Sequence, residues 1–252
     1  MITSAACKRL IGLCAVASGG LVKSNGYATR RPAGGLVSAL RTLDRWGADE
    51  IVVLDISRRG ALDERVLHAI RESKVTTPVA YGGGIRATTD VQRLMTVGCD
   101  RFILETLLFE DIDAVRRIAD LVGRQALIAS VPIRVHEGAV GVWRPHGFID
   151  FIPIRSQLLQ LPVSEYLVTA IDTEGRSGSF PVATLAMYDD FPRQTVLSFG
   201  GHDAGTAVQA LAHPAVAAVV LGNINVEREL TLPGLRSATI AERLPIRSYR
   251  LT

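Results

Sequence analysis

The sequence predicts a (β/α)8 barrel of the TIM type. Two observations predict it: eight short apolar runs alternate with helix-like stretches, and the chain contains an internal duplication. Runs that are apolar on both faces and rich in Val, Ile and Leu are typical of strands buried in a parallel sheet. Repeated alternation of strand and helix over 252 residues favours a barrel, with a Rossmann-type open sheet as the weaker alternative.

The duplication becomes visible when the chain is shifted by 117 residues, the distance from Asp55 to Asp172. The shift places Leu54-Asp55-Ile56 on Ile171-Asp172-Thr173, Gly83-Gly84 on Gly200-Gly201, and Phe102-Ile103-Leu104 on Val219-Val220-Leu221. We therefore expect a single domain over residues 1–252, built from two duplicated half-barrels at about 1–123 and 124–252.

The elements follow in order from the hydrophobic pattern. The expected strands are Leu10–Val16, Ile51–Ile56, Val79–Gly82, Phe102–Thr106, Ala126–Ile133, Leu167–Asp172, Thr195–Phe199 and Ala218–Leu221. The clearest helical stretches between them are Leu36–Trp46, Leu62–Glu72, Thr89–Val97, Asp111–Leu121 and Gly205–Ala212. Asp111 is a candidate N-cap, and Thr88 or Thr89 is a candidate start for the helix that ends before Gly98.

Two insertions interrupt the alternation, each after an expected strand. Lys23–Gly35 contains Gly26, Pro32, Gly34 and Gly35, and we expect a flexible loop that is a candidate lid. Val135–Gly147 alternates glycine and proline with β-prone residues. It predicts a small hairpin, for which a purely structural role is favoured.

The composition excludes several classes of protein. A net charge of +3 from 28 basic and 25 acidic residues provides no dominant field for nucleic acid. The run Leu10–Val16 is too short for a signal peptide core or a membrane span. Three cysteines without metal-ligand spacing predict no metal and a cytoplasmic, reducing environment. We also expect no cofactor. Cys14 could offer thiol chemistry, but a small buried hydrophobe is the favoured interpretation.

Function in such barrels sits at the C-terminal ends of the strands, and glycines cluster there. Gly83-Gly84 and Gly200-Gly201 each begin 28 residues after an aspartate, Asp55 or Asp172. Glycines at strand ends let the backbone approach a ligand and offer N–H groups to phosphate, although tight turns use them too. The repeated offset favours a ligand with two phosphates. Further candidate ligand contacts are Thr106, Glu174, Gly175, Arg176, Gly222 and Asn223, and His202 is a less certain one.

These motifs resemble a known family. Lys8-Arg9-Leu10-Ile11, Val22-Lys23, Leu54-Asp55-Ile56, Gly82-Gly83-Gly84-Ile85, Ile171-Asp172-Thr173-Glu174-Gly175 and Gly200-Gly201 resemble the cyclase subunit of imidazole glycerol phosphate synthase, the HisF family. The resemblance implies a duplicated (β/α)8 barrel that binds a substrate with two phosphates. It also implies a class I glutaminase partner, HisH-like, at the N-terminal face, whose ammonia passes through the barrel. The related histidine-pathway isomerase is similar but needs no ammonia channel.

The chain differs from that family at the two positions that carry out proton transfer during closure of the imidazole ring. The resemblance places the two proton-transfer aspartates of the family at Ala15 and Pro132, and neither side chain can carry a proton. Losing a general acid or base costs roughly 10²- to 10⁴-fold in rate, so little cyclase activity is expected. Asp55, Asp172 and Lys23 do match functional family positions, and Asp55 and Asp172 are possible catalytic groups. Glu105 replaces an amide and would repel a phosphate.

The N-terminal ends of the strands match the family better. The resemblance assigns an ammonia gate of four charged residues to Arg9, Glu50, Arg101 and Glu165, all with the charge sign of the family. Each alone could be a solvated surface residue. Together, two acids and two bases form a set in which every charge has a partner.

Three hypotheses follow. The preferred one is a barrel that accepts ammonia from a glutaminase and channels it to an acceptor other than the usual cyclase substrate, such as an amidine-forming step in bacterial surface-sugar (lipopolysaccharide) biosynthesis. The second is a cyclase of histidine biosynthesis that uses other carboxylates, for which Asp55, Asp172, Glu105 and Glu174 are available. The third is a non-catalytic pseudoenzyme that activates its glutaminase.

Overall fold

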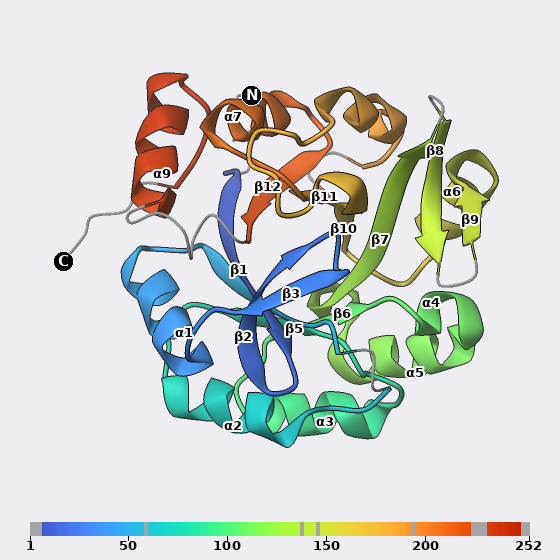
Figure 1. The fold of residues 1–252 in the computed structure, drawn as a ribbon. Helices are drawn as coiled ribbons and strands as arrows, with labels where there is room; N and C mark the ends of the chain where they lie inside the picture. Colours follow the sequence, from blue (N-terminus) through green and yellow to red (C-terminus); the bar gives the residue numbers. More distant parts are fainter. Residues whose placement is uncertain are drawn as a thin grey trace, which may run out of the picture.

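The barrel predicted from the sequence is present. The computed structural model describes residues 7–57, 60–136, 139–144, 147–192, 195–222 and 231–247. Within these residues, eight parallel strands close on themselves, because β12 pairs with β1 and β10 pairs with β7. In order around the barrel they are β1 (Arg9–Ala17), β4 (Glu50–Asp55), β5 (Val79–Gly82), β6 (Arg101–Leu104), β7 (Leu127–His136), β10 (Glu165–Ala170), β11 (Val196–Phe199) and β12 (Val216–Leu221). Figure 1 shows the helices around the outside of these strands.

The five predicted helices are confirmed, with shifts of one or two residues at their ends. They are α1 (Leu36–Arg45), α2 (Glu64–Ser73), α3 (Thr88–Thr96), α5 (Ile112–Val122) and α7 (Ala204–Ala212). In α1, Leu36, Leu40 and Leu43 are buried, a spacing that places them on one face of the helix. Such faces cover the outside of the barrel and form the larger part of the core.

The structure confirms both predicted helix starts. The Asp111 carboxylate caps α5 by accepting a hydrogen bond of 2.8 Å from the Ala114 N–H. α3 begins at Thr88, one of the two predicted starts, and its N-cap is Ala87. The Asp90 carboxylate reaches back and accepts a hydrogen bond of 2.9 Å from the Ala87 N–H.

Several elements have no counterpart in the sequence prediction. They are α4 (Leu107–Glu110), α6 (Phe151–Leu159), α9 (Thr231–Ala241) and the 3-10 helices η1 (Arg124–Ala126), η2 (Ile171–Thr173) and η3 (Val182–Tyr188). The two longer helices, α6 and α9, were not predicted because Pro153 and Pro233 are residues typical of loops. Both lie in the first turn, where a missing N–H removes no intrahelical hydrogen bond.

The first insertion forms a hairpin that the sequence analysis did not predict, and its role as a flexible lid stays a prediction. β2 (Gly20–Asn25) and β3 (Thr29–Pro32) pair antiparallel, with Lys23 opposite Arg31. The turn between them has positive φ at both central residues, 58° at Gly26 and 55° at Tyr27, and the Ala28 N–H donates to the Asn25 carbonyl at 3.1 Å. This combination is that of a type I′ turn, whose twist matches paired strands.

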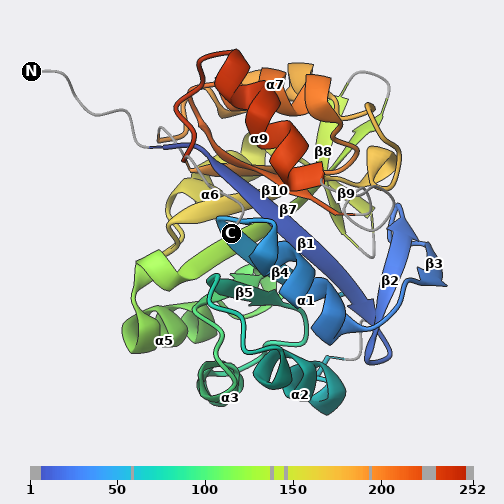
Figure 2. The ribbon, with the colours of Figure 1, turned by 90° about the vertical axis from the view of Figure 1, so that its left-hand side faces the viewer.

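The second insertion is the small hairpin that the sequence predicts. β7 extends beyond the barrel and pairs antiparallel with β8 (Ala139–Arg144), which pairs with β9 (Gly147–Asp150). In Figure 2 this extension and the β2–β3 hairpin lie on the same side of the barrel, toward the C-terminal end of β1. Both insertions therefore flank the mouth of the barrel, where function is expected.

The interior of the barrel is a second, smaller core. Its buried members alternate along the strands, as inward-facing residues do. They include Ile11, Leu13 and Ala15 on β1, Val52 on β4, Ala80 on β5, Ile103 on β6, Ile128 on β7, Leu167 on β10, Leu197 and Phe199 on β11, and Val220 on β12. Among the described residues, no helix combines the length and the apolar composition that crossing a membrane requires.

Candidate functional site

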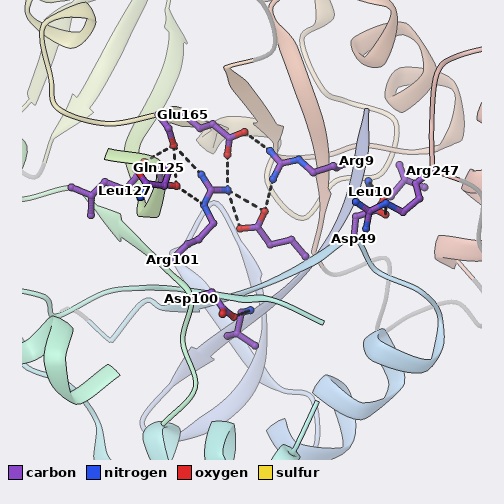
Figure 3. Close-up of polar contacts among 12 residues, drawn as sticks. Arg9, Leu10, Asp49, Asp100, Arg101, Gln125, Leu127, Glu165 and Arg247 are labelled. Carbon is purple, nitrogen blue, oxygen red and sulfur yellow. Dashed lines mark hydrogen bonds and ion pairs between the residues drawn. The ribbon is translucent and has the colours of Figure 1, made fainter. Parts of the chain in front are cut away.

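Four charged side chains form a closed ring at the N-terminal end of the barrel, as the sequence predicts. We call Arg9, Glu50, Arg101 and Glu165 the charged ring; they stand at the first residues of β1, β4, β6 and β10. Glu50 pairs with Arg9 at 2.7 Å and with Arg101 at 3.2 Å. Glu165 pairs with Arg101 at 2.6 Å and also with Arg9. Acid and base thus alternate around the ring. Figure 3 shows Arg9, Arg101 and Glu165 among these contacts.

Each charged side chain of the ring forms ion pairs with two other members of the ring. The Glu50 side chain is only 3% exposed, and this burial raises its pKa, while Arg101 and Arg9 act in the opposite direction. Arg101 also donates hydrogen bonds to two groups outside the ring, the Ser164 hydroxyl at 3.2 Å and the Gln125 carbonyl at 3.3 Å. The sequence prediction missed these two supports, which lie in connections with no motif of their own.

A cavity of about 300 Å³ opens at the other end of the barrel. It lies between the C-terminal ends of β4, β5, β6, β7 and β10, and the two insertions contribute Tyr27 and Trp143 to its wall. The predicted site residues that line it are Asp55, Gly83, Gly84 and Thr106, all from the first half-barrel. They lie around one cavity, and their contact with a ligand stays a prediction.

The two positions that lack the proton-transfer aspartates lie at this same end. Pro132 lines the cavity, in register with Thr169 on the neighbouring strand β10. Ala15 is buried among the apolar residues of the barrel interior. Neither offers a group that can exchange a proton. Cys14 does not replace them, because burial raises the pKa of its thiol to about 12.

The paired glycines repeat their backbone geometry in both halves. The φ angles are 109° and 72° at Gly83 and Gly84, and 111° and 87° at Gly200 and Gly201. A Cβ atom on Gly84 would lie 2.4 Å from the Ala61 carbonyl oxygen, and one on Gly201 would lie 2.6 Å from that of Thr173. Backbone packing alone accounts for glycine at both positions, so their contact with a ligand stays a prediction.

Glu174 has a different role from the predicted one. Its carboxylate is buried and accepts hydrogen bonds from the Ser24 hydroxyl at 2.7 Å and the Tyr27 N–H at 3.2 Å, while its carbonyl accepts one from the Gly26 N–H at 3.1 Å. Burial raises the pKa of this carboxyl against the effect of those donors. Both carboxylate oxygens are thus engaged by the hairpin, and Glu174 anchors it instead of presenting itself to a ligand.

The other predicted residues of the second half are more open. Gly175 and Arg176 are exposed after η2, and Gly222 is half-buried after β12. Asn223 lies outside the described residues. Asp172 forms an ion pair of 2.6 Å with Arg134 at the end of β7, a partner that the sequence analysis did not identify. Lys23 lies in β2 and is half-buried.

His202 packs in the protein interior instead of facing a ligand. Its ring stacks on Phe180 with centroids 4.0 Å apart, and its Nε2 lies 3.2 Å from the Ser198 hydroxyl. Burial lowers its pKa to about 3, so the ring is neutral at physiological pH. The expectation of a ligand contact arose from its place beside Gly201, but the ring is buried against Phe180 and Ser198 instead.

Comparison with known proteins agrees with this architecture. The family model described as "Histidine biosynthesis protein" matches residues 10–231. Three similar curated proteins are each named imidazole glycerol phosphate synthase subunit HisF. The relative from Exiguobacterium sp. (strain ATCC BAA-1283 / AT1b) is 28% identical over 249 residues, covering 95% of this chain and 96% of the relative. The relative from Streptomyces coelicolor is 29% identical over 223 residues, covering 84% and 89%. The one from Thermobifida fusca is 26% identical over 253 residues, covering 95% and 98%.

Proposed function

Because this chain belongs to the histidine biosynthesis protein family, we propose that it is a HisF-like barrel subunit of a glutamine amidotransferase complex. In this proposal it accepts ammonia from a class I glutaminase and channels it to an acceptor other than the usual cyclase substrate. The observation that carries the proposal is a contrast between the two ends of the barrel. The charged ring is complete, with four ion pairs, whereas Ala15, buried inside the barrel, and Pro132, on the cavity wall, are both apolar.

The ring supports a role as the ammonia entrance. It occupies the N-terminal face, against which the HisH-like glutaminase would dock. Replacing partly buried ion pairs by apolar packing of equal volume is often neutral or stabilising, which supports a purpose for the ring other than stability. Above it, Ile11, Val52, Ile103 and Leu167 line an apolar interior that a neutral ammonia molecule could cross far more readily than a charged ammonium ion.

The mouth supports a changed acceptor. Ring closure needs proton transfer, and the positions that supply it in the resembling family hold a methyl group and a pyrrolidine ring here. If a separate enzyme binds the acceptor and carries out the reaction, this chain needs no proton-transfer groups of its own. Amidine formation on a surface sugar, as in lipopolysaccharide biosynthesis, is the acceptor reaction that we favour. The proposal also includes a phosphorylated ligand at the strand ends. It does not include binding to nucleic acid or to a membrane.

A second candidate is a working cyclase of histidine biosynthesis, and the names of the similar curated proteins favour it. It would need a carboxylate at the mouth. Glu174 is engaged by the hairpin and Asp172 by Arg134, which leaves Asp55 and Glu105 on the cavity wall. The two candidates therefore differ in whether these carboxylates can replace the aspartates that Ala15 and Pro132 displace.

The expected compartment is reducing. Cys7, Cys14 and Cys99 are all free in the structure, and burial raises the pKa of the Cys99 thiol to about 12, as it does for Cys14. Buried thiols of this kind are protected from oxidation by their protonation. The proposal places the complex in the cytoplasm, where a glutaminase and glutamine are both present.

The experiment is co-expression of the chain with a class I glutaminase from the same genome. We expect the two to co-purify and the chain to raise the rate of glutamine hydrolysis, with the ammonia released. A double variant, Ala15→Asp with Pro132→Asp, is then given the cyclase substrate and ammonium salts. Imidazole product from the double variant but not from the parent would show a mouth that lacks only its acid and base. The proposal is contradicted if the chain neither binds a glutaminase of this kind nor raises its rate of glutamine hydrolysis. If hydrolysis is stimulated but ammonia does not reach the mouth of the barrel, the chain is a pseudoenzyme.

A further inference from the structure

A polar residue stands directly before each member of the charged ring in the sequence. These four preceding residues are Lys8, Asp49, Asp100 and Ser164. The side chain of each forms a hydrogen bond with the backbone at the start of an adjacent strand. In every case this is the strand that comes before in the order around the barrel: β12 for β1, β1 for β4, β5 for β6 and β7 for β10.

The two aspartates each hold both backbone groups of one residue on the adjacent strand (Figure 3). The Asp49 carboxylate accepts a hydrogen bond of 2.9 Å from the Leu10 N–H, and the Asp49 N–H donates one of 2.9 Å to the Leu10 carbonyl. Asp100 repeats this pair of bonds with Val79, at 2.9 and 2.8 Å. Two bonds to one residue fix the start of the strand more closely than one, so the ring member that follows each aspartate begins from a fixed point.

Lys8 and Ser164 hold the starts of β1 and β10 by donating hydrogen bonds. The Lys8 ammonium is buried and donates to the carbonyl oxygens of His213, at 3.0 Å, and of Val216, the first residue of β12. Burial lowers the pKa of Lys8 to about 8, so placing a charge there has a cost that an apolar side chain would avoid. The Ser164 hydroxyl donates to the carbonyl of Leu127, the first residue of β7, at 3.1 Å.

Within the described part of the chain, the four barrel strands without a ring member do not show this arrangement. The residues directly before β5, β7 and β12 are Pro78, Ala126 and Ala215, whose side chains have no hydrogen-bonding group. Thr195 precedes β11, and its hydroxyl donates to the Pro192 carbonyl in its own connection, at 2.7 Å. A device that served only the stability of the barrel would have no reason to follow the ring in this way.

We propose that Lys8, Asp49, Asp100 and Ser164 are positioning residues of the charged ring, which hold four strand starts where the ring side chains can meet. The closed ring requires each of its side chains to reach two partners at once. Hydrogen bonds weaken steeply with distance and angle, so a small shift of one strand start would open the ring. The inference rests on the proposed function in one respect, that the ring is the ammonia entrance; the positioning itself is tested without ammonia or a glutaminase.

The test measures the mobility of the ring arginines in the full chain. With arginine labelled in ¹³C and ¹⁵N, NMR gives the rotation rate of each guanidinium about its Nε–Cζ bond, which ion pairs slow. Asp100→Ala should speed the rotation of Arg101 at least about threefold, the change that corresponds to weakening its contacts by the net value of one hydrogen bond. Asp100→Asn keeps an acceptor for the Val79 N–H and should restore the parent rate. Lys8→Met should speed the rotation of Arg9 by a similar factor.

Thr195→Val is the matched control, since it removes a hydroxyl from the same position before a strand that carries no ring member. It should leave both rotation rates as in the parent. Ser164 is not used, because its hydroxyl contacts Arg101 directly. Circular dichroism spectra and unfolding midpoints establish that each variant is folded.

The inference is overturned if Arg101 rotates at the parent rate in Asp100→Ala, if Asp100→Asn is as mobile as Asp100→Ala, or if Thr195→Val speeds rotation equally. Glutaminase stimulation is measured separately on the parent. A parent that stimulates no glutaminase contradicts the proposed function while the rotation rates still support the positioning residues, and unchanged rates refute these residues alone.

Discussion

Replacing Arg101 by Met tests whether the members of the charged ring stabilise one another. Arg101 contacts both acids of the ring, at 3.2 Å to Glu50 and 2.6 Å to Glu165. Its loss leaves Glu50, 3% exposed, with Arg9 as its single cationic partner. Leaving a buried charge uncompensated costs about 3–5 kcal/mol. Because Arg9 remains at 2.7 Å, we expect the lower end of that range, a loss of about 3 kcal/mol.

The assay is urea unfolding at pH 7.5, followed by circular dichroism, with the free energy taken from the linear extrapolation. Arg116→Met is the control: Arg116 pairs with Asp113 at a similar 2.8 Å, but both side chains are largely exposed, so the loss should stay below about 1 kcal/mol. The double variant Glu50→Met with Arg101→Met should be more stable than Arg101→Met alone, because it also removes the buried charge. A double variant that is less stable than the single one would refute this reasoning.

Three further predictions concern the rest of the site. Glu174→Ala should release the β2–β3 hairpin, so that trypsin cleaves after the exposed Arg30 faster than in the parent while the unfolding midpoint changes little; an unchanged cleavage rate would show that Glu174 is not the anchor. Because burial lowers the pKa of His202 to about 3, only the unfolded state takes up a proton at this residue between pH 7 and 5. The free energy of unfolding of the parent should therefore fall by about 2 kcal/mol over that interval, and that of His202→Gln should not show this fall. Equal pH dependence in the two proteins would contradict the buried neutral ring. Gly201→Ala should cost about 2 kcal/mol, since φ is 87° and the new Cβ meets the Thr173 carbonyl oxygen at 2.6 Å, whereas Gly205→Ala in the first turn of α7 should be neutral or slightly stabilising.

The fold was predictable because its signals are local and repeated. Each barrel strand is buried on both faces, so it is a continuous apolar run that differs plainly from the amphipathic helices beside it. The elements that were missed carry mixed signals. Pro153 suggests a loop although α6 begins only two residues earlier, and the β2–β3 hairpin holds exposed arginines and a type I′ turn whose second central residue is Tyr27, not the usual glycine.

The site was predictable where residues sit at strand ends and not where it depends on burial. The family resemblance singled out Arg9, Glu50, Arg101 and Glu165, and their places at strand starts bring them together, since parallel strands in a barrel begin at one face. The role of Glu174 depends on a hairpin that folds back over it from about 150 residues away in the chain, a contact that no local pattern encodes. The same hairpin brings Tyr27 into the mouth, and Trp143 arrives there only through β8.

The most direct test of the central claim is to supply the unmodified chain, together with its glutaminase, with glutamine and the cyclase substrate, and to measure free ammonia and imidazole glycerol phosphate in one reaction. The account predicts strongly stimulated glutamine hydrolysis, ammonia recovered in amounts equal to the glutamate formed, and no imidazole product. Imidazole glycerol phosphate formed in step with glutamate would contradict it, because the mouth would then close the ring without the carboxylates that Ala15 and Pro132 replace.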